Sequence, residues 1–324
     1  MTIPVVNLAD ALTPSGLTSL AAVQQLRDAA MATGFFYIQN HGISADLLSR
    51  QFQLARELMG LPLTVRQALS ILNSKTMRGF EALGEQTLDE TAQPDLKECF
   101  YCGMDYPPRH PYVLAGYETY GGNQWPAKLP DAPAQCEAYI QALLGISRRL
   151  MQLLALSLYL PETWFDATSQ SPMVTLRMIR YPAHPPDADE RTFGAGAHTD
   201  WGALTLLAQD AYGGLEVCLP DGSWLAAPPM PDTFIVNLGD MMPRWTNGLY
   251  RSSLHRVRNT LSGGQARYSI PFFYEPDYLA RIETVPGTLA LGTTPLFEPC
   301  TAGEHLKQMY QKTYGLIAQS QAAA

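Results

Sequence analysis

The stretch GAGAHTDWGALTLLAQD, residues 194–210, places a histidine and an aspartate two positions apart, just before an apolar run. On an extended strand, side chains at positions i and i+2 point to the same face. His198 and Asp200 can therefore aim an imidazole and a carboxylate at one point. The pair alone does not establish a site, because such pairs also arise by chance and a single histidine is usually a structural residue.

The composition is that of a folded protein with a large core and an acidic surface. Of the 324 residues, 46% are hydrophobic and 16% are charged, and the formal net charge is −8. This charge argues against nucleic acid or an anionic membrane as the main partner. The sequence has no apolar run of about 18 residues, and its start, MTIPVVNLADAL, does not resemble a signal peptide. We therefore expect a cytoplasmic protein without a transmembrane helix.

The five cysteines are an odd number, which suits reduced thiols better than a disulfide framework. Cys99 and Cys102 form a CxxC motif, for which a zinc or redox site is the alternative. The chain has no second CxxC, and the surrounding ECFYCG is aromatic and strand-like. We therefore expect these two cysteines to be structural.

Residues 1–160 are predicted to form a mostly helical region that packs on the rest of the chain. Apolar residues recur there at helical spacing, and Ser44 is a plausible helix cap. The elements expected in this region are strands at 3–8 and 35–42 and helices at 18–33, 44–59 and 134–159.

Residues 161–324 have a different texture, in which short β-rich runs alternate with turn signals such as Asp221-Gly222 and Asn247-Gly248. Many short strands with such turns favour a sandwich or jelly roll. The two regions are expected to form one compact unit. The strands expected here are 173–182, 203–210, 214–219, 233–240, 254–259 and 267–276, followed by a helix at 303–319.

His255, in SSLHRVRN, is the best candidate for a third group beside His198 and Asp200, because it also lies on a predicted strand. Two histidines and one carboxylate form the facial triad of non-haem Fe(II) oxygenases, which leaves open positions on the metal. The remaining histidines lie in a QNHG turn, among prolines or in the C-terminal helix, and they fit less well: His41, His110, His184 and His305.

The tripeptide RYS, residues 267–269, strengthens this hypothesis. Strand alternation places Arg267 and Ser269 on one face. A planar guanidinium binds a carboxylate through two parallel hydrogen bonds, and a hydroxyl adds a third. The pair therefore suits an anionic cosubstrate bound beside a metal.

With these motifs in order, the chain resembles the 2-oxoglutarate- and Fe(II)-dependent oxygenases of the isopenicillin N synthase-like group. The resemblance spans nearly the whole chain, from IPVVNL and GFFYIQNHGI through PDLKECFYCG to HTDWG, LHRVRN and RYSIPFFYEP. It implies a mainly β fold, a double-stranded β-helix or jelly roll, with helices outside.

The resemblance also implies roles for single residues. It assigns His198, Asp200 and His255 as iron ligands, and Arg267 and Ser269 as the pair that binds the distal carboxylate of 2-oxoglutarate. Other residues near the cosubstrate are expected on the strand 173–182. Tyr181 matches a tyrosine that contacts the cosubstrate, Ile179 departs from the asparagine of many relatives, and Arg177 either faces the pocket or lies on the surface.

The implied activity is oxidation of a C–H bond of a small molecule, with Fe(II), O2 and 2-oxoglutarate, and with release of succinate and CO2. The same scaffold also supports an oxidase or cyclase that does not use 2-oxoglutarate, and an ethylene-forming enzyme. A non-catalytic jelly-roll binding module is the alternative from another class, and the intact triad with the arginine–serine pair argues against it. The primary substrate and the oligomeric state stay open.

Several further residues are candidates for the site or its surroundings. Asp240 is expected to cap a tight turn in which Gly239 adopts a positive φ, and Glu98 is either a substrate contact or a strand-edge carboxylate. Gly315 is a candidate hinge of a C-terminal lid, for which a frayed terminus is the alternative. Four aromatic residues either line the pocket or belong to the core: Phe193, Trp201, Phe273 and Tyr274.

Overall fold

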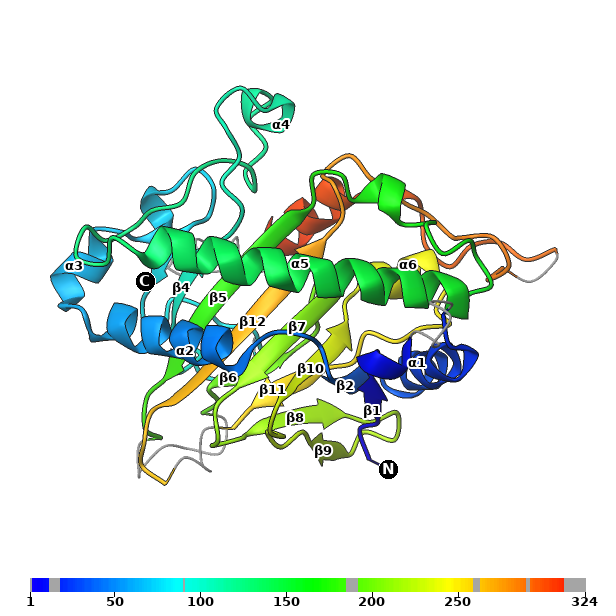
Figure 1. Ribbon diagram of the computed structural model, residues 1–324, viewed down its shortest axis with the longest axis horizontal. Helices are drawn as coiled ribbons and strands as arrows, with labels where there is room; N and C mark the ends of the chain where they lie inside the picture. The colour runs from blue at the N-terminus through cyan, green and yellow to red at the C-terminus, as the bar shows by residue number, and fades with distance from the viewer. Residues whose placement is uncertain are drawn as a thin grey trace.

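The computed structural model describes residues 2–11, 18–89, 91–184, 192–258, 263–289 and 292–311. Two β-sheets form its centre, and the long helices lie across the larger sheet (Figure 1). This arrangement confirms the predicted mainly β jelly roll with helices packed outside.

Within the described residues, the larger sheet has eight strands and the smaller sheet four. The order in the larger sheet is β1 (Val5–Asn7), β2 (Phe35–Gln39), β10 (Thr233–Leu238), β7 (Leu204–Gln209), β12 (Arg267–Glu275), β5 (Met173–Tyr181), β4 (Glu98–Cys102) and β3 (Gly79–Glu81). The order in the smaller sheet is β6 (Ala195–His198), β11 (His255–Val257), β8 (Leu215–Cys218) and β9 (Trp224–Ala226). A separate pair joins β13 (Arg281–Ile282) and β14 (Cys300–Thr301).

The three long helices of the N-terminal region are confirmed as α1 (Leu20–Ala32), α2 (Ala45–Gly60) and α5 (Ala132–Ser157). The Ser44 hydroxyl caps α2 as expected, because it accepts a hydrogen bond from the Leu47 backbone N–H. The shorter helical elements are η1 (Leu8–Ala11), α3 (Leu63–Gln67), η2 (Ile71–Asn73), α4 (Pro111–Leu114), η3 (Asp166–Thr168) and α6 (Met241–Trp245), and residues 302–311 are also helical.

The alternation of side chains along β5 shows how the sheet divides the interior. Leu176 and Met178 point to the helix-covered side and join the core that α1, α2 and α5 complete. Ile179 and Tyr181 belong to a second buried cluster with residues of the smaller sheet, such as Val217. The space between the two sheets is therefore lined by alternate residues of the central strands, and this is where a site can form.

Strand β4 explains why the CxxC motif is structural. Cys99 and Cys102 are both buried on this strand, but they are three positions apart and join different buried clusters. Side chains at such positions point to opposite faces of a strand, so the two thiols do not converge on one ion.

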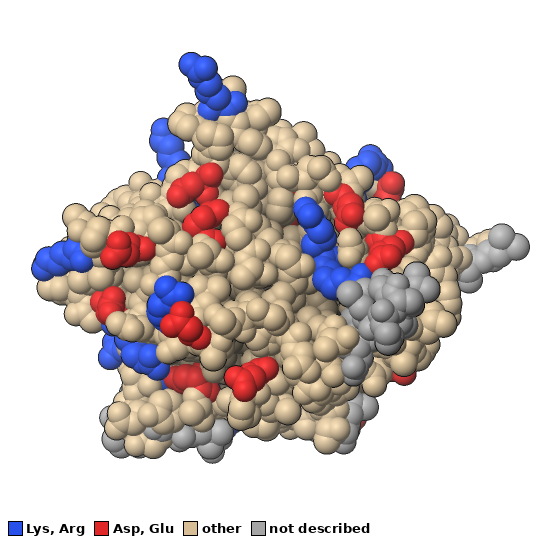
Figure 2. Space-filling model, viewed as in Figure 1, with Lys and Arg blue, Asp and Glu red and all other residues tan. Residues whose placement is uncertain are grey.

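The charged surface residues are mixed on the face drawn in Figure 2. Acidic and basic side chains lie among larger uncharged areas there, without a wide region of one sign. In the part of the chain that the structure describes, no helix combines the length and apolar character needed to cross a bilayer.

Candidate active site

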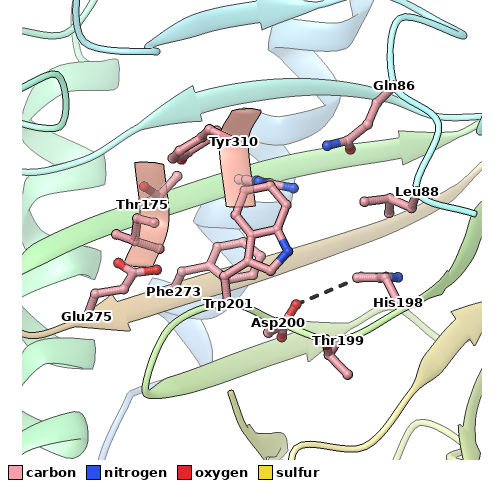
Figure 3. A pocket seen from close by; sticks show the side chains of 12 residues that line it. Gln86, Leu88, Thr175, His198, Thr199, Asp200, Trp201, Phe273, Glu275 and Tyr310 are labelled. Carbon is pink, nitrogen blue, oxygen red and sulfur yellow. Dashed lines mark ion pairs between the residues drawn. The ribbon is translucent and has the colours of Figure 1, made fainter. Parts of the chain in front are cut away.

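The three predicted metal ligands converge between the two sheets. His198 ends β6, His255 begins β11, and the two residues are direct partners across these antiparallel strands. Their Nε2 atoms lie 3.8 and 3.7 Å from Asp200 Oδ1, and the three donor atoms all lie within 4.8 Å of one another. Figure 3 shows His198 directed at Asp200. Such a cluster can hold one metal ion.

Asp200 reaches this point in a different way from the one expected. The prediction placed His198 and Asp200 on one strand, but β6 ends at His198 and Asp200 lies in the connection that follows. Its position is set by two hydrogen bonds to Oδ2, from Thr205 Oγ1 at 2.5 Å and from Asn237 Nδ2 at 2.7 Å. These donors come from β7 and β10, so the larger sheet turns Oδ1 towards the histidines of the smaller sheet.

Gly239 supports the same connection by close backbone approach. The expected positive φ is wrong, because Gly239 is not among the glycines in that region of conformational space. A Cβ atom there would lie 2.3 Å from the Gly202 carbonyl oxygen and 2.9 Å from that of Asp200. Glycine is therefore required for space. The next residue, Asp240, donates its backbone N–H to the Asp200 carbonyl.

Both histidines have the tautomer that a metal site needs. His198 Nδ1 lies 2.7 Å from the Gly196 carbonyl oxygen, and His255 Nδ1 lies 3.2 Å from that of Ser253. A carbonyl only accepts hydrogen bonds, so Nδ1 carries the proton and Nε2 presents its lone pair to the cluster. Burial, aided by His255, lowers the pKa of His198 to about 3 and keeps the free imidazole neutral.

Arg267 lies at the far end of a cavity that begins at the three ligands. This cavity has an empty volume of about 560 Å³, and its lining includes His198, Asp200, His255, Arg267 and Ser269. Arg267 is 1% exposed, yet its Nε and Nη1 atoms have no hydrogen-bond partner among the described residues, while Nη2 donates to Gln209 Oε1 at 3.1 Å. A buried guanidinium with two vacant donors fits a bound carboxylate.

The other predicted cosubstrate residues surround this guanidinium. The Tyr181 ring lies under it, with 4.7 Å between the guanidinium carbon and the ring centroid. The Ser269 hydroxyl lies 3.5 Å from the Tyr181 hydroxyl. Ile179 lines the same cavity with an apolar side chain. These residues form a pocket around the Arg267 guanidinium.

Lys97 is a residue of this cavity that the sequence reasoning missed. Its ammonium group pairs with Asp95 at 2.5 Å, and both side chains are almost fully buried. Burial alone would lower the pKa of Lys97, but Asp95 raises it above the usual value, so the lysine stays charged. Asp95 also accepts the Gly196 N–H, two residues before His198. The motif PDLKE, already noted for its resemblance, was the available signal.

A second cavity adjoins the first and shares His198, Asp200, Arg177 and Phe273 with it. Figure 3 shows its labelled lining: His198 and Leu88 lie at one end, Trp201 crosses the middle, and Glu275 and Thr175 lie at the other end. Burial raises the pKa of Glu275 to about 8, against the lowering effect of Arg177. The sequence reasoning also missed Glu275, although strand alternation from Phe273 pointed to it.

Arg177 faces the interior and lines both cavities. Its guanidinium carbon lies 4.6 Å from the Tyr101 ring centroid and 4.7 Å from that of Phe273. Of the two interpretations of this residue, the one that places it on the surface is wrong. The stacking on two rings fixes the charge at the junction of the cavities.

The remaining candidates divide among the second cavity, other parts of the fold and residues that the structure does not describe. Asp240 Oδ2 accepts a hydrogen bond from Thr199, and Glu98 is buried between Arg66 and Arg180 as an ion-pair partner. Of the four aromatic candidates, Trp201 and Phe273 line the second cavity, Tyr274 belongs to the helix-side core and Phe193 packs against two arginines. The predicted lid, including Gly315, lies outside the described residues.

The jelly roll, the triad and the buried arginine together define a class of protein: mononuclear metal enzymes that use an anionic cosubstrate. Residues 172–276 match the profile of the 2OG-Fe(II) oxygenase superfamily, and residues 3–128 match that of the non-haem dioxygenase in morphine synthesis N-terminal region. The chain belongs to this family and is a 2-oxoglutarate- and Fe(II)-dependent dioxygenase.

Individual relatives agree with this assignment. The chain is 36% identical over 319 residues to the 2-oxoglutarate-Fe(II) type oxidoreductase hxnY of Emericella nidulans, covering 96% of this chain and 90% of the relative. It is 34% identical to homoarginine-6-hydroxylase 2-ODD-233 of Oryza sativa subsp. japonica, covering 89% and 88%. A full-length Neurospora crassa protein in complex with alpha-KG and thymine superposes with a TM-score of 0.83 at 26% identity, covering 95% and 96%.

Proposed function

We propose that His198, Asp200 and His255 hold the Fe(II) ion, and that Arg267 binds the distal carboxylate of 2-oxoglutarate. The observation that carries this proposal is the pair of vacant donors on a guanidinium that is 1% exposed, at the far end of a cavity that begins at the triad. Ser269 and Tyr181 border the same carboxylate position. Fe(II), when bound, supplies the open coordination positions at which the 2-oxo acid and dioxygen react.

The chain's own residues contribute orientation and exclusion of water. The Nδ1 hydrogen bonds of the two histidines fix their rings, and Thr205 and Asn237 hold the Asp200 carboxylate. Arg267 fixes the far end of the cosubstrate. Apolar side chains complete the wall of its cavity and keep bulk water away: Phe35, Ile179, Leu207, Leu215 and Val257.

The second cavity is the proposed place of the small-molecule substrate, because it opens on His198 and Asp200 from the side opposite Arg267. A C–H bond of a molecule held there faces the metal position. Two of the relatives are a homoarginine-6-hydroxylase and a protein solved in complex with thymine, and both of these ligands are small nitrogen-containing molecules. They support a substrate of this size.

An anaerobic titration tests the proposal. Addition of Fe(II) and 2-oxoglutarate under argon is expected to give a weak visible charge-transfer band, and oxygen is then expected to convert 2-oxoglutarate to succinate. A protein that binds Fe(II) but gives no band and no succinate would contradict it and favour the oxidase that does not use 2-oxoglutarate. The same incubation is examined for ethylene, because an ethylene-forming enzyme is one alternative on this scaffold and Arg177 lies beside the proposed cosubstrate position.

We also propose that the enzyme works in the cytoplasm on a free small molecule, without nucleic acid or membrane as partner. The support is compositional: a net charge of −8 and an odd number of cysteines.

A further inference from the structure

Strands β5 and β12 carry both cavities on one face, and they end in opposite charges. At one end of the pair, Arg267 lies opposite Tyr181, and at the other end Phe273 lies opposite Thr175, with Glu275 two residues further on. Because i and i+2 share a face, the row that begins at Arg267 ends at Glu275. The two charged residues therefore border the cosubstrate cavity and the substrate cavity respectively.

Like the Nε and Nη1 atoms of Arg267, the Glu275 carboxylate has no hydrogen-bond partner among the residues that the structure describes. Its side chain is almost fully buried at 8% exposure, and no residue in the described ranges donates a hydrogen bond to its carboxylate. Figure 3 shows this carboxylate beside Thr175, at the end of the cavity away from His198. Burial without donors disfavours the charged carboxylate, as its raised pKa shows, and a ligand that supplies N–H donors stabilises the charged form.

Within the described ranges, the groups next to Glu275 act on it by charge and by contact, not through hydrogen bonds to its carboxylate. The charge of Arg177 acts on Glu275, but its guanidinium is stacked on the rings of Tyr101 and Phe273. Gly202 lies directly against the side chain, where an added Cβ would be 2.7 Å from Glu275 Cγ and 2.8 Å from Oε1. The close contact fixes the carboxylate in place without bonding to it.

We propose that Glu275 is the residue that selects the substrate, by accepting hydrogen bonds from one or more N–H groups of a small nitrogen-containing molecule. This inference rests on the proposed function, because it requires the substrate to lie in the second cavity. A carboxylate has two acceptor oxygens, so a group with several N–H donors compensates its burial better than one hydroxyl. Trp201, Phe273 and Tyr310 supply flat apolar walls for the rest of the molecule.

The N–H donors that Glu275 would bind can belong to a cation, such as an ammonium or guanidinium group, or to a neutral ring or amide. The test uses the enzyme loaded with Fe(II) and 2-oxoglutarate under argon, and it follows the change in the visible band when a probe enters. The probes are matched pairs: homoarginine with its analogue in which the guanidinium nitrogens are fully methylated, thymine with 1,3-dimethylthymine, and a library of small amines and lactams with their N-methyl or hydroxyl analogues.

We expect saturable band changes from N–H compounds and much weaker ones from their partners. Glu275→Gln keeps the size and one acceptor oxygen but removes the charge, so it is expected to weaken a cationic probe about tenfold to a hundredfold and a neutral N–H probe less. Glu275→Asp retains the preference for N–H compounds. Glu283→Gln, the same change at a half-exposed residue, is the control and leaves all affinities unchanged.

The outcomes separate this inference from the proposed function. If no band forms with Fe(II) and 2-oxoglutarate, the proposed function itself fails. If the band forms but N–H compounds and their analogues bind equally, if no N–H compound in the library changes it, or if Glu275→Gln binds every probe like the parent, the selection by Glu275 is overturned.

Discussion

The two ends of the β5–β12 pair differ in charge and in burial, and only the Arg267 end was predicted from the sequence. Arg267 is 1% exposed and lies in a pocket of Tyr181, Ser269 and Gln209, whereas Glu275 is 8% exposed and borders a cavity that Trp201 crosses. The first end suits a ligand common to the whole family, and the second suits one that varies among relatives. In the roles proposed above, one strand pair thus carries both the cosubstrate end and the substrate end of the site.

The largest expected effect comes from the metal ligands that both ends share. His198→Ala, Asp200→Ala and His255→Ala are each expected to reduce succinate formation to background, because three ligands form the minimal set of this site. Iron content and succinate are measured together, with His41→Gln as a histidine control away from the cluster. Full turnover in any of the three variants with iron still bound would remove that residue from the ligand set.

Arg267→Lys tests the cationic end. Lysine keeps the charge but loses the planar pair of donors, so the Kd for 2-oxoglutarate is expected to rise about tenfold to a hundredfold. Anaerobic titration of the visible band measures it, and Arg281→Lys at an exposed ion pair is the control. An unchanged Kd would show that Arg267 is not the anchor. A defect confined to substrate affinity would favour the oxidase that does not use 2-oxoglutarate.

Asn237→Ala tests whether the larger sheet holds Asp200 in place at the metal site. Loss of the hydrogen bond to Asp200 Oδ2 is expected to weaken Fe(II) binding roughly tenfold, since outer partners of metal ligands typically contribute that much or more. The measurement is a competition with a chelator of known affinity. Equal iron affinity in parent and variant would mean that Thr205 alone orients the carboxylate.

In the metal-free protein, Glu275→Gln tests the acidic end through its effect on stability. Burial raises the folded pKa of Glu275 to about 8, above the usual value of 4.5. The folded protein therefore binds more protons than the unfolded chain between about pH 4.5 and 8, and stability falls as pH rises through this window. Glu275→Gln does not lose stability in this way. The difference in unfolding free energy between the variant and the parent is therefore expected to change in favour of the variant by roughly 1–4 kcal/mol across the window.

Thermal unfolding of the metal-free protein at pH 5 and pH 8.5 measures this difference. A constant gap in Tm between parent and Glu275→Gln at both pH values would show that Glu275 titrates as an ordinary exposed carboxylate.

The residues that the sequence predicted correctly are those whose signal is local. The turn and alternation patterns located the strands that carry His255 and Arg267, and a serine before an apolar helix located the start of α2. The placement of Asp200 next to His198 was also foreseen, but for the wrong reason, because the strand ends before it.

What the sequence did not reveal depends on contacts between distant segments. Asn237 and Thr205 hold Asp200 from two strands of the other sheet, and no spacing in the chain announces such a contact. Gly239 was expected to need a positive φ, because that is the requirement visible from the local sequence. Glycine is needed there because a side chain would collide with the backbone of Gly202. Glu275 drew no attention because a single carboxylate on a strand has many ordinary explanations.

The way the three ligands divide between the sheets has a mechanical consequence. His198 and His255 belong to neighbouring strands of the smaller sheet, while Asp200 is bonded to β7 and β10 of the larger one. An ion held by all three residues links the two sheets, and its binding free energy adds to the stability of the folded protein. Removal of the ion should therefore loosen the edge formed by β6 and β11 first, which amide hydrogen exchange can resolve strand by strand.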